Sequence, residues 1–189
     1  MLQCIPLSLE GLLLVRNRSF HDERGHFVEV YRRDRYREIG IPDDFVQDNQ
    51  SLSRFPGVVR GLHFQRPPFA QAKLVRVLSG RILDVVVDLR RGSPTYGRYE
   101  AAELTADTHE QLYVPIGFAH GFCTLEPDTV VTYKVSAHYA PDHDAGIHWA
   151  DPDIGITWPV PSSAAVVSPK DRVLPRLRDI ESPFLHVRP

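Results

Sequence analysis

Two histidine-bearing segments hold most of the chemistry that this sequence offers. One is Gly57-Val-Val-Arg-Gly-Leu-His-Phe-Gln65 and the other is Pro115-Ile-Gly-Phe-Ala-His-Gly-Phe122. An imidazole titrates near neutral pH, so His63 and His120 can each serve as a metal ligand or as a proton carrier. Loops that bind other cofactors are missing, because the chain has no G-x-x-x-x-G-K-[ST], no G-x-G-x-x-G and no G-x-S-x-G.

The spacing of these two segments resembles the two sequence motifs of the cupin barrel. In cupins that bind a metal, the first motif carries H-x-H and a following glutamate. Here Gln65 replaces the second histidine, and Gln71 or Ala72 stands where the glutamate is expected. A divalent metal prefers several imidazole or carboxylate ligands, and His63 with His120 alone makes a poor site. We therefore expect the barrel without a metal and without any other cofactor.

Short strands are expected to position these side chains. The β-branched runs Val75–Leu78 and Arg81–Leu89 flank Ser79-Gly80, which predicts a hairpin. Thr129–Ser136 alternates, so that Val131, Tyr133 and Val135 share one face. Further extended segments are Gln111–Val114 and the run from Phe45 through Gln65, broken at Pro56-Gly57. With many turn residues and little helical periodicity, the prediction is a mainly β fold, an antiparallel jelly-roll (cupin) barrel with short peripheral helices.

The length of 189 residues suits a single domain with a substantial core. We divide it into an N-terminal arm over about 1–40, a barrel over about 41–140 and a C-terminal wrap over about 141–189. Within the arm, the stretch from Asp34 to Gly40 predicts one short helical turn, capped by the aspartate and closed by the glycine. The four arginines around it are expected to lie on a solvated face: Arg32, Arg33, Arg35 and Arg37.

Composition excludes several classes of protein. A formal net charge of -2 argues against a surface that coats nucleic acid. The longest apolar runs are too short to cross a bilayer. The first residues lack a basic start and are interrupted by polar residues and a proline, so no secretory segment is expected. Cys4 and Cys123 are then expected to be free thiols that pack in a reduced, cytoplasmic protein.

Over most of its length, from Phe20 to Pro175, the chain is similar to the dTDP-4-dehydrorhamnose 3,5-epimerase family. Several long motifs follow the order of that family, and together they are far more specific than any one of them. The matching pieces are Asp22–Glu29, Phe45–Ser51, Arg60–Gln65, Gln71–Arg76, Asp84–Arg90, Ser93–Gly97, Tyr113–Phe122 and Ser168–Asp171.

The resemblance implies a reaction and a set of catalytic residues. The reaction is inversion at C3 and C5 of a dTDP-4-keto-6-deoxy-hexose by proton transfer: dTDP-4-dehydro-6-deoxy-D-glucose becomes dTDP-4-dehydro-L-rhamnose. His63 would be the general base, Asp171 its carboxylate partner, and Tyr133 the acid on the opposite face of the sugar. Lys73 and His120 would lie near the sugar and its enolate. These residue types suit the chemistry, because a ketone acidifies the adjacent C–H bonds and a cation stabilises the enolate.

The resemblance also implies how the nucleotide-sugar is held. The residues in contact with it would be Arg60, Gln47, Asn49 and Lys170. Arg24 and Glu29 would reach a substrate in the neighbouring subunit, which makes a homodimer the expected assembly. The family usually has glutamate where this chain has Asp144, so the shorter side chain is expected to alter one substrate contact.

Taken one at a time, most of these residues have a structural alternative. His63 could be a hydrogen-bonded core histidine, Tyr133 a core tyrosine, Lys73 an edge-strand lysine, and His120 or Asp171 a turn residue. Taken as a set, they favour the functional interpretation.

One geometric difficulty concerns Arg60 and His63. Strict alternation along a strand places them on opposite faces, so Arg60 reaches the site only if Gly61 bends the strand or if Arg60 lies at the rim.

Three other functions remain open at this stage. The chain could be a single-site epimerase that inverts only C3 or only C5. It could instead be a keto-isomerase with the same barrel. A sugar-nucleotide-binding or metal-binding cupin without epimerase activity is the third possibility. The joint presence of His63, Asp171 and Tyr133 disfavours this last class, since a binding protein needs neither an acid nor a base.

Overall fold

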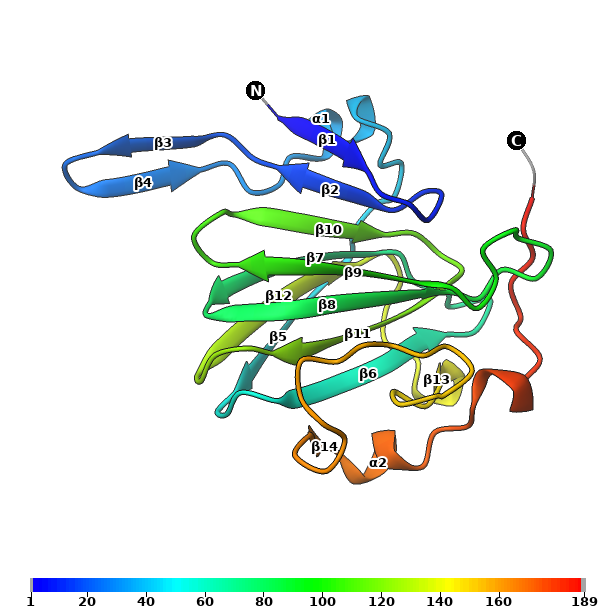
Figure 1. The fold of residues 1–189 in the computed structure, drawn as a ribbon. Helices are drawn as coiled ribbons and strands as arrows, with labels where there is room; N and C mark the ends of the chain where they lie inside the picture. The colour runs from blue at the N-terminus through cyan, green and yellow to red at the C-terminus, as the bar shows by residue number, and fades with distance from the viewer. Residues whose placement is uncertain (1, 188–189) are drawn as a thin grey trace.

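The computed structural model describes residues 2–187. Two sheets of antiparallel strands face one another in it (Figure 1). The first sheet contains, in spatial order, β1 (Gln3–Pro6), β2 (Leu13–Arg16), β10 (Glu110–Val114), β7 (Lys73–Ser79), β12 (Thr129–Val135) and β5 (Gln47–Ser53). The second contains β13 (Asp144–Gly146), β6 (Val58–Gln65), β11 (Phe118–Thr124), β8 (Arg81–Asp88) and β9 (Tyr99–Thr105), with β14 (Val166–Val167) paired in parallel to β6.

Apolar side chains fill the space between the two sheets. Alternate residues of each strand point inward, as Val75 and Val77 of β7 do against Ile82 and Val86 of β8. Strand β8 is also apolar on its other face, where Val85 and its neighbours pack beneath the C-terminal part of the chain. The prediction of a mainly β, antiparallel jelly-roll architecture is confirmed.

The hairpin predicted around Ser79-Gly80 is wrong. Both strands exist, but β7 pairs with β10 and β12 in the first sheet, whereas β8 pairs with β9 and β11 in the second. The chain therefore crosses from one sheet to the other at Gly80, which has a φ of 78°. This connection lets the inward faces of both strands meet across the core instead of lying side by side.

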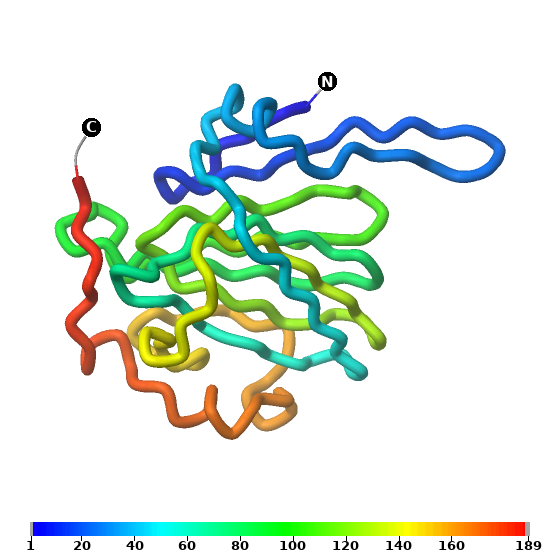
Figure 2. Tube along the Cα trace, turned by 180° about the vertical axis from the view of Figure 1, so that it is seen from behind, coloured from blue at the N-terminus to red at the C-terminus, as the bar shows by residue number. Residues whose placement is uncertain are grey.

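The N-terminal part adds a hairpin and a short helix. Strands β3 (Ser19–Asp22) and β4 (Gly25–Val28) form a separate two-stranded ribbon that projects beyond the sandwich (Figures 1 and 2). Helix α1 (Arg33–Glu38) confirms the predicted helical turn, and Gly40 follows it with a φ of 91°. Its predicted cap is wrong: the N-cap is Arg32, and Asp34 lies in the first turn, where its carboxylate pairs with that arginine.

The C-terminal part runs along the second sheet and past one end of the sandwich (Figure 2). It contains a 3-10 turn η1 (Pro141–His143), helix α2 (Pro169–Arg172) and a second 3-10 turn η2 (Leu177–Asp179). Through β13 and β14 it adds neighbours to β6, so that α2 lies beside this strand. No helix within residues 2–187 is long and apolar enough to span a membrane.

Candidate active site

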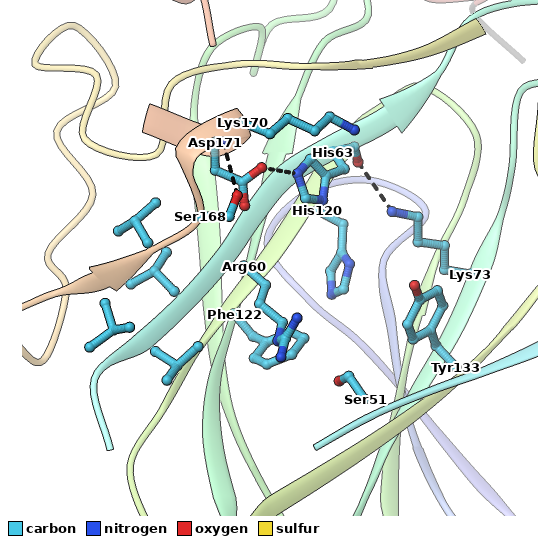
Figure 3. Close-up of a pocket in the computed structure, with 14 residues that line it drawn as sticks. Ser51, Arg60, His63, Lys73, His120, Phe122, Tyr133, Ser168, Lys170 and Asp171 are labelled. Atoms are coloured by element: carbon cyan, nitrogen blue, oxygen red, sulfur yellow. Dashed lines mark hydrogen bonds and ion pairs between the residues drawn. The ribbon is translucent and has the colours of Figure 1, made fainter. Parts of the chain in front are cut away.

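Ten of the twelve predicted site residues line one cavity between the two sheets, and Figure 3 shows its main part. Its main part has a volume of about 460 Å³, and the predicted residues that line it are Arg60, His63, Lys73, His120, Tyr133, Lys170 and Asp171. An adjoining part of about 170 Å³ shares several of these side chains and adds Gln47, Asn49 and Asp144. The positions are far apart in sequence, and the fold brings them together.

His63 and Asp171 form a close pair at the cavity wall. Nε2 of His63, on β6, lies 2.7 Å from Oδ1 of Asp171, on α2. The other carboxylate oxygen accepts a hydrogen bond from the backbone N–H of Gly61, and the Ser168 hydroxyl caps α2 by accepting from the Asp171 N–H. Burial raises the pKa of Asp171, but the hydrogen bonds and the charge of His63 outweigh it and hold this pKa below its ordinary value. The carboxylate thus stays ionised and orients the ring.

A β-bulge in β6 explains how Arg60 and His63 reach the same cavity. His63 is paired with His120 of β11, and Arg60 is paired with Phe122, so two residues of β6 oppose the single Gly121. The extra residue restores both side chains to one face. Gly61 thus bends the strand, which is one of the two ways in which the sequence analysis allowed Arg60 to reach the site. Strict alternation would have placed Arg60 on the face away from the cavity.

At the bulge, the backbone conformation and the surroundings of Gly61 leave no room for a side chain, which leads to a stability prediction. Its φ is 134°, and an added Cβ would lie 2.6 Å from the Cα of Gly121. We expect Gly61→Ala to lower the free energy of unfolding by about 3 kcal/mol, from backbone strain and overpacking combined. Gly92→Ala is the control, because Gly92 has a φ of 84° but open space around it; it should cost only about 1 kcal/mol. Urea unfolding measures both, and equal losses would contradict the packing argument.

Lys73 lies in the interior of the sandwich. Its strand, β7, runs between β10 and β12, so it is not an edge strand. The ammonium Nζ donates a hydrogen bond to the backbone carbonyl of His63 over 3.1 Å. Burial lowers the pKa of Lys73 to about 8, while the charges of Asp84 and Asp144 raise it. A lysine with this pKa carries a positive charge at neutral pH and gives the cavity a cation that can stabilise a developing anion.

Tyr133 and His120 come from opposite sheets. Tyr133 lies on β12 with Val131 and Val135 on the same inward face, as predicted. Burial raises the pKa of its phenol, which the charge of Arg60 partly counters, so the phenol keeps its proton well above neutral pH. His120 lies on β11, almost fully buried, with Nε2 only 2.8 Å from Oδ1 of Asp84.

Polar residues form the outer rim of the cavity. Gln47 donates to Asn49 over 2.9 Å and accepts from the backbone N–H of Tyr139. Asp144 contacts the ammonium of Lys170 and accepts from the Tyr139 hydroxyl over 3.1 Å. Asp144 therefore already contacts two rim side chains.

Sequence reasoning missed Tyr139 and Asp84. Nothing in the pattern around Tyr139 marks it. Asp84 did carry a signal, because an acidic residue between Leu83 and Val85 in a buried apolar run is costly unless it is paired.

Arg24 and Glu29 do not lie at this cavity. Arg24 is at the tip of the β3–β4 ribbon, where its side chain is 85% exposed and pairs with Asp22. Glu29 follows the ribbon and pairs with Arg35 of α1 over 3.2 Å. Within one chain, the structure separates these two residues from the other ten.

The fold and the cavity define a class of protein: a cupin-like β-sandwich enzyme in which basic and acidic side chains face one cavity between the sheets. The family model described as dTDP-4-dehydrorhamnose 3,5-epimerase matches residues 6–179. A Sinorhizobium fredii protein of that name is 50% identical over 182 residues, which covers 96% of this chain and 93% of the relative. The chain belongs to the dTDP-4-dehydrorhamnose 3,5-epimerase family, and the prediction from the sequence motifs is confirmed.

Solved structures give the same relationship. RmlC from Legionella pneumophila, in complex with dTDP-4-keto-L-rhamnose, matches with a TM-score of 0.93 and 38% identity, over 99% of this chain and 100% of that one. ChmJ from Streptomyces bikiniensis, described as a 3'-monoepimerase and solved with dTDP as a double mutant of one histidine and one tyrosine, matches with a TM-score of 0.85. It is 33% identical, over 92% of this chain and 87% of that one.

Proposed function

We propose that this protein inverts C3 and C5 of dTDP-4-dehydro-6-deoxy-D-glucose to give dTDP-4-dehydro-L-rhamnose. The observation that carries the proposal is the placement of His63 and Tyr133 on opposite sheets, facing one cavity. Inversion requires a proton to leave one face of the sugar ring and another to arrive on the other face. A base on one wall and an acid on the opposite wall meet that requirement.

The steps follow from the chemistry of the residues. His63, oriented by Asp171, removes the proton next to the ketone, and the ring becomes an imidazolium that the carboxylate stabilises. The electrons move into an enolate whose oxygen is stabilised by the ammonium of Lys73. Tyr133 then delivers its proton to the carbon from the other side. The nucleotide-sugar would be held by the cations of Arg60 and Lys170 and by the polar rim.

A single-site epimerase remains the alternative. ChmJ has a similar fold and is described as a 3'-monoepimerase, so family membership alone leaves the number of inverted carbons open. The two positions altered in the ChmJ double mutant, a histidine and a tyrosine, are spaced like His63 and Tyr133. This agreement supports a shared base and acid, whichever carbons are inverted.

The test is incubation of the protein with dTDP-4-keto-6-deoxyglucose in D₂O. NMR of the product reads deuterium and configuration at C3 and at C5 separately. We expect deuterium and inversion at both carbons. Exchange and inversion at C3 alone would replace the proposal by the single-site alternative, and a protein that binds dTDP without any exchange would refute enzymatic function.

We also propose that the working unit is a homodimer in the cytoplasm. Each chain would form one domain, with its arm, barrel and wrap as predicted. The β3–β4 ribbon carries Phe20 and Phe27 as an exposed cross-strand pair, and exposed aromatic surface of this kind favours a protein contact. Arg24 would then contribute to the cavity of the other chain. Cys4 and Cys123 are free thiols, which fits a reducing compartment.

Subunit complementation tests this arrangement. Arg24→Ala and His63→Ala should each show low activity at substrate concentrations below KM. When the two are mixed and allowed to exchange, roughly one quarter of wild-type activity should return, because half of the dimers are hybrids with one intact site. Sedimentation velocity should show a dimer at micromolar concentration. A fully active monomer, or mixing without any gain, would contradict the proposal.

Activity should also survive removal of metal ions. Gln65, which stands where a metal-binding cupin has histidine, has its amide engaged: Nε2 donates to the carbonyls of Phe69 and His138, and Oε1 accepts from the Ala140 N–H. We expect no more than a twofold change in turnover after dialysis against a strong chelator, twofold being about the scatter of such assays. A large loss that one specific metal restores would show that the inference from Gln65 is wrong.

A further inference from the structure

Asp84 is a carboxylate with no exposure to solvent in the middle of an apolar strand. It lies on β8 between Ile82 and Val86, which face the core between the sheets. Among residues 2–187, neither of its oxygens has a hydrogen-bond partner. Its close contact is Nε2 of His120 at 2.8 Å, and this contact lacks hydrogen-bond alignment. Burying a charged group in this way is costly, so its presence here needs a reason.

Asp88, on the same strand and equally buried, shows what a structural carboxylate looks like. It accepts hydrogen bonds from Arg90, through the backbone N–H, Nε and a terminal nitrogen, and from the hydroxyls of Ser93 and Thr95, all at 2.7 to 3.0 Å. These donors tie down the loop after β8 and offset the cost of burial. Asp84 organises no loop, and its neighbours are the cavity residues His120 and Lys73.

The contact of Asp84 repeats the residue types and the distance of the His63–Asp171 pair, although only the His63–Asp171 contact is aligned as a hydrogen bond. His63 and His120 are partners in the register of β6 and β11, and each presents Nε2 to an aspartate Oδ1, at 2.7 and 2.8 Å. One pair lies at the cavity wall, where the His63 side chain is 32% exposed. The other pair is more deeply buried: the His120 side chain, which also lines the cavity, is only 6% exposed. Figure 3 shows His120 between His63 and Tyr133.

We propose that Asp84 is a positioning residue of this active site. Its negative charge, 2.8 Å from Nε2 of His120, favours the tautomer with the proton on Nε2 and leaves Nδ1 as a hydrogen-bond acceptor for a sugar hydroxyl. The same charge stabilises the ammonium of Lys73. Only the identity of the hydroxyl-bearing ligand rests on the proposed function. Burial lowers the pKa of His120, against the opposing effect of Asp84, so the ring is neutral when it accepts this hydrogen bond. Lys73 is then the cation that faces the enolate.

The charge on Lys73 depends on the groups around it. Asp84 faces it from β8 and Asp144 from β13, and both raise its pKa. His120 of β11, Tyr133 of β12 and His63 and Arg60 of β6 line the same cavity, as do Lys170 and Asp171 of α2. Removal of the Asp84 charge therefore lowers the pKa of Lys73 further below about 8. Because Lys73 acts in its protonated form, activity at alkaline pH is lost earlier.

The first test uses the wild-type protein and does not require activity. Nitrogen NMR of ¹⁵N-histidine-labelled protein distinguishes the two ring tautomers, and the His120 signals are assigned as those missing from His120→Gln. The expected result is a neutral ring protonated at Nε2. A neutral ring protonated at Nδ1 would overturn the proposal. A protein that proves inactive on the keto-sugar still gives this result, so failure of the proposed function is separable.

The second test compares Asp84→Asn with Asp88→Asn, two isosteric changes on one strand. For Asp84→Asn we expect kcat to fall at least ~10-fold with a smaller change in KM. The alkaline limb of the kcat–pH profile should move down by on the order of one unit. Asp88→Asn should lower the melting temperature and leave this limb in place. An unmoved limb in folded Asp84→Asn, or the same displacement in both variants, would overturn the role of its charge. If Asp84→Asn does not fold, Lys73→Arg serves instead. Arginine keeps its charge at all accessible pH values, so the alkaline limb of the kcat–pH profile should disappear in this variant. A limb identical to that of the wild type would also overturn the role of the Asp84 charge.

Discussion

Replacing His63 with alanine is expected to lower turnover by at least ~10²-fold, the usual contribution of a general base. Nε2 of His63 is held by Asp171 at 2.7 Å, which leaves the other ring nitrogen to take the proton. The other histidine of the cavity, His120, has a similar contact with Asp84 but is almost fully buried. The side chain is neither a surface group nor a sealed core histidine, being 32% exposed toward the cavity. Stopped-flow or coupled assays of epimerisation, with deuterium exchange at C3 and C5 measured in parallel, give the loss.

Asp171→Asn should be impaired nearly as severely. The amide has the same shape but no charge, so it can neither fix the tautomer nor stabilise the imidazolium. The matched control is His138→Ala, which removes an exposed histidine outside the cavity lining and should leave turnover within twofold of wild type, about the scatter of such assays. If folded His63→Ala exchanges the C3 and C5 protons of the sugar at near-normal rates, His63 is not the general base.

Much of the fold could be predicted from the spacing of apolar residues. Alternation in the stretch around Tyr133 located β12 and its inward face, and turn residues located the breaks between strands. What alternation does not encode is which strands pair. Arg81–Asp88 is apolar on both faces because the second sheet is covered on both sides, so its pattern could not say whether it pairs with β7 or crosses to the other sheet.

The site was predictable only in part, and for a similar reason. His63 and Asp171 are 108 residues apart, and no local pattern joins them; the resemblance to the family did. Because of the bulge at Gly61, strict alternation along β6 does not predict which face Arg60 lies on, although the glycine itself indicated a possible bend. Asp84 escaped because its partners, His120 and Lys73, come from two other strands that only the folded sandwich brings near it.

Tyr133→Phe is expected to separate two events that normally occur together. Without the phenol, His63 can still remove the proton beside the ketone, and Lys73 can still stabilise the enolate. The enolate then regains a proton from His63 on the face that it left, so the carbon exchanges its hydrogen with solvent but keeps its configuration. We therefore expect inversion to fall by ~10²-fold or more, while wash-out of substrate protons into D₂O falls much less.

Tyr139→Phe is the matched control for this experiment. The Tyr139 hydroxyl lies at the cavity rim and donates to Asp144 over 3.1 Å. Its loss should change KM for the nucleotide-sugar and leave the ratio of exchange to inversion as in wild type. The pair of variants thus distinguishes a phenol that transfers a proton from one that shapes the binding site.

The ratio of exchange to inversion decides the role of Tyr133. Burial raises the pKa of its phenol, so the phenol keeps its proton throughout the neutral pH range. In the wild-type protein, the ratio of exchange to inversion should therefore not vary with pH in that range. If exchange and inversion fall together in Tyr133→Phe, the residue shapes the cavity and another group is the acid. Full inversion at C3 and C5 by this variant would assign the second proton to water or to another residue. Inversion lost at only one of the two carbons would mean that the phenol reaches only that carbon, and that the two inversions use different acids within the same cavity.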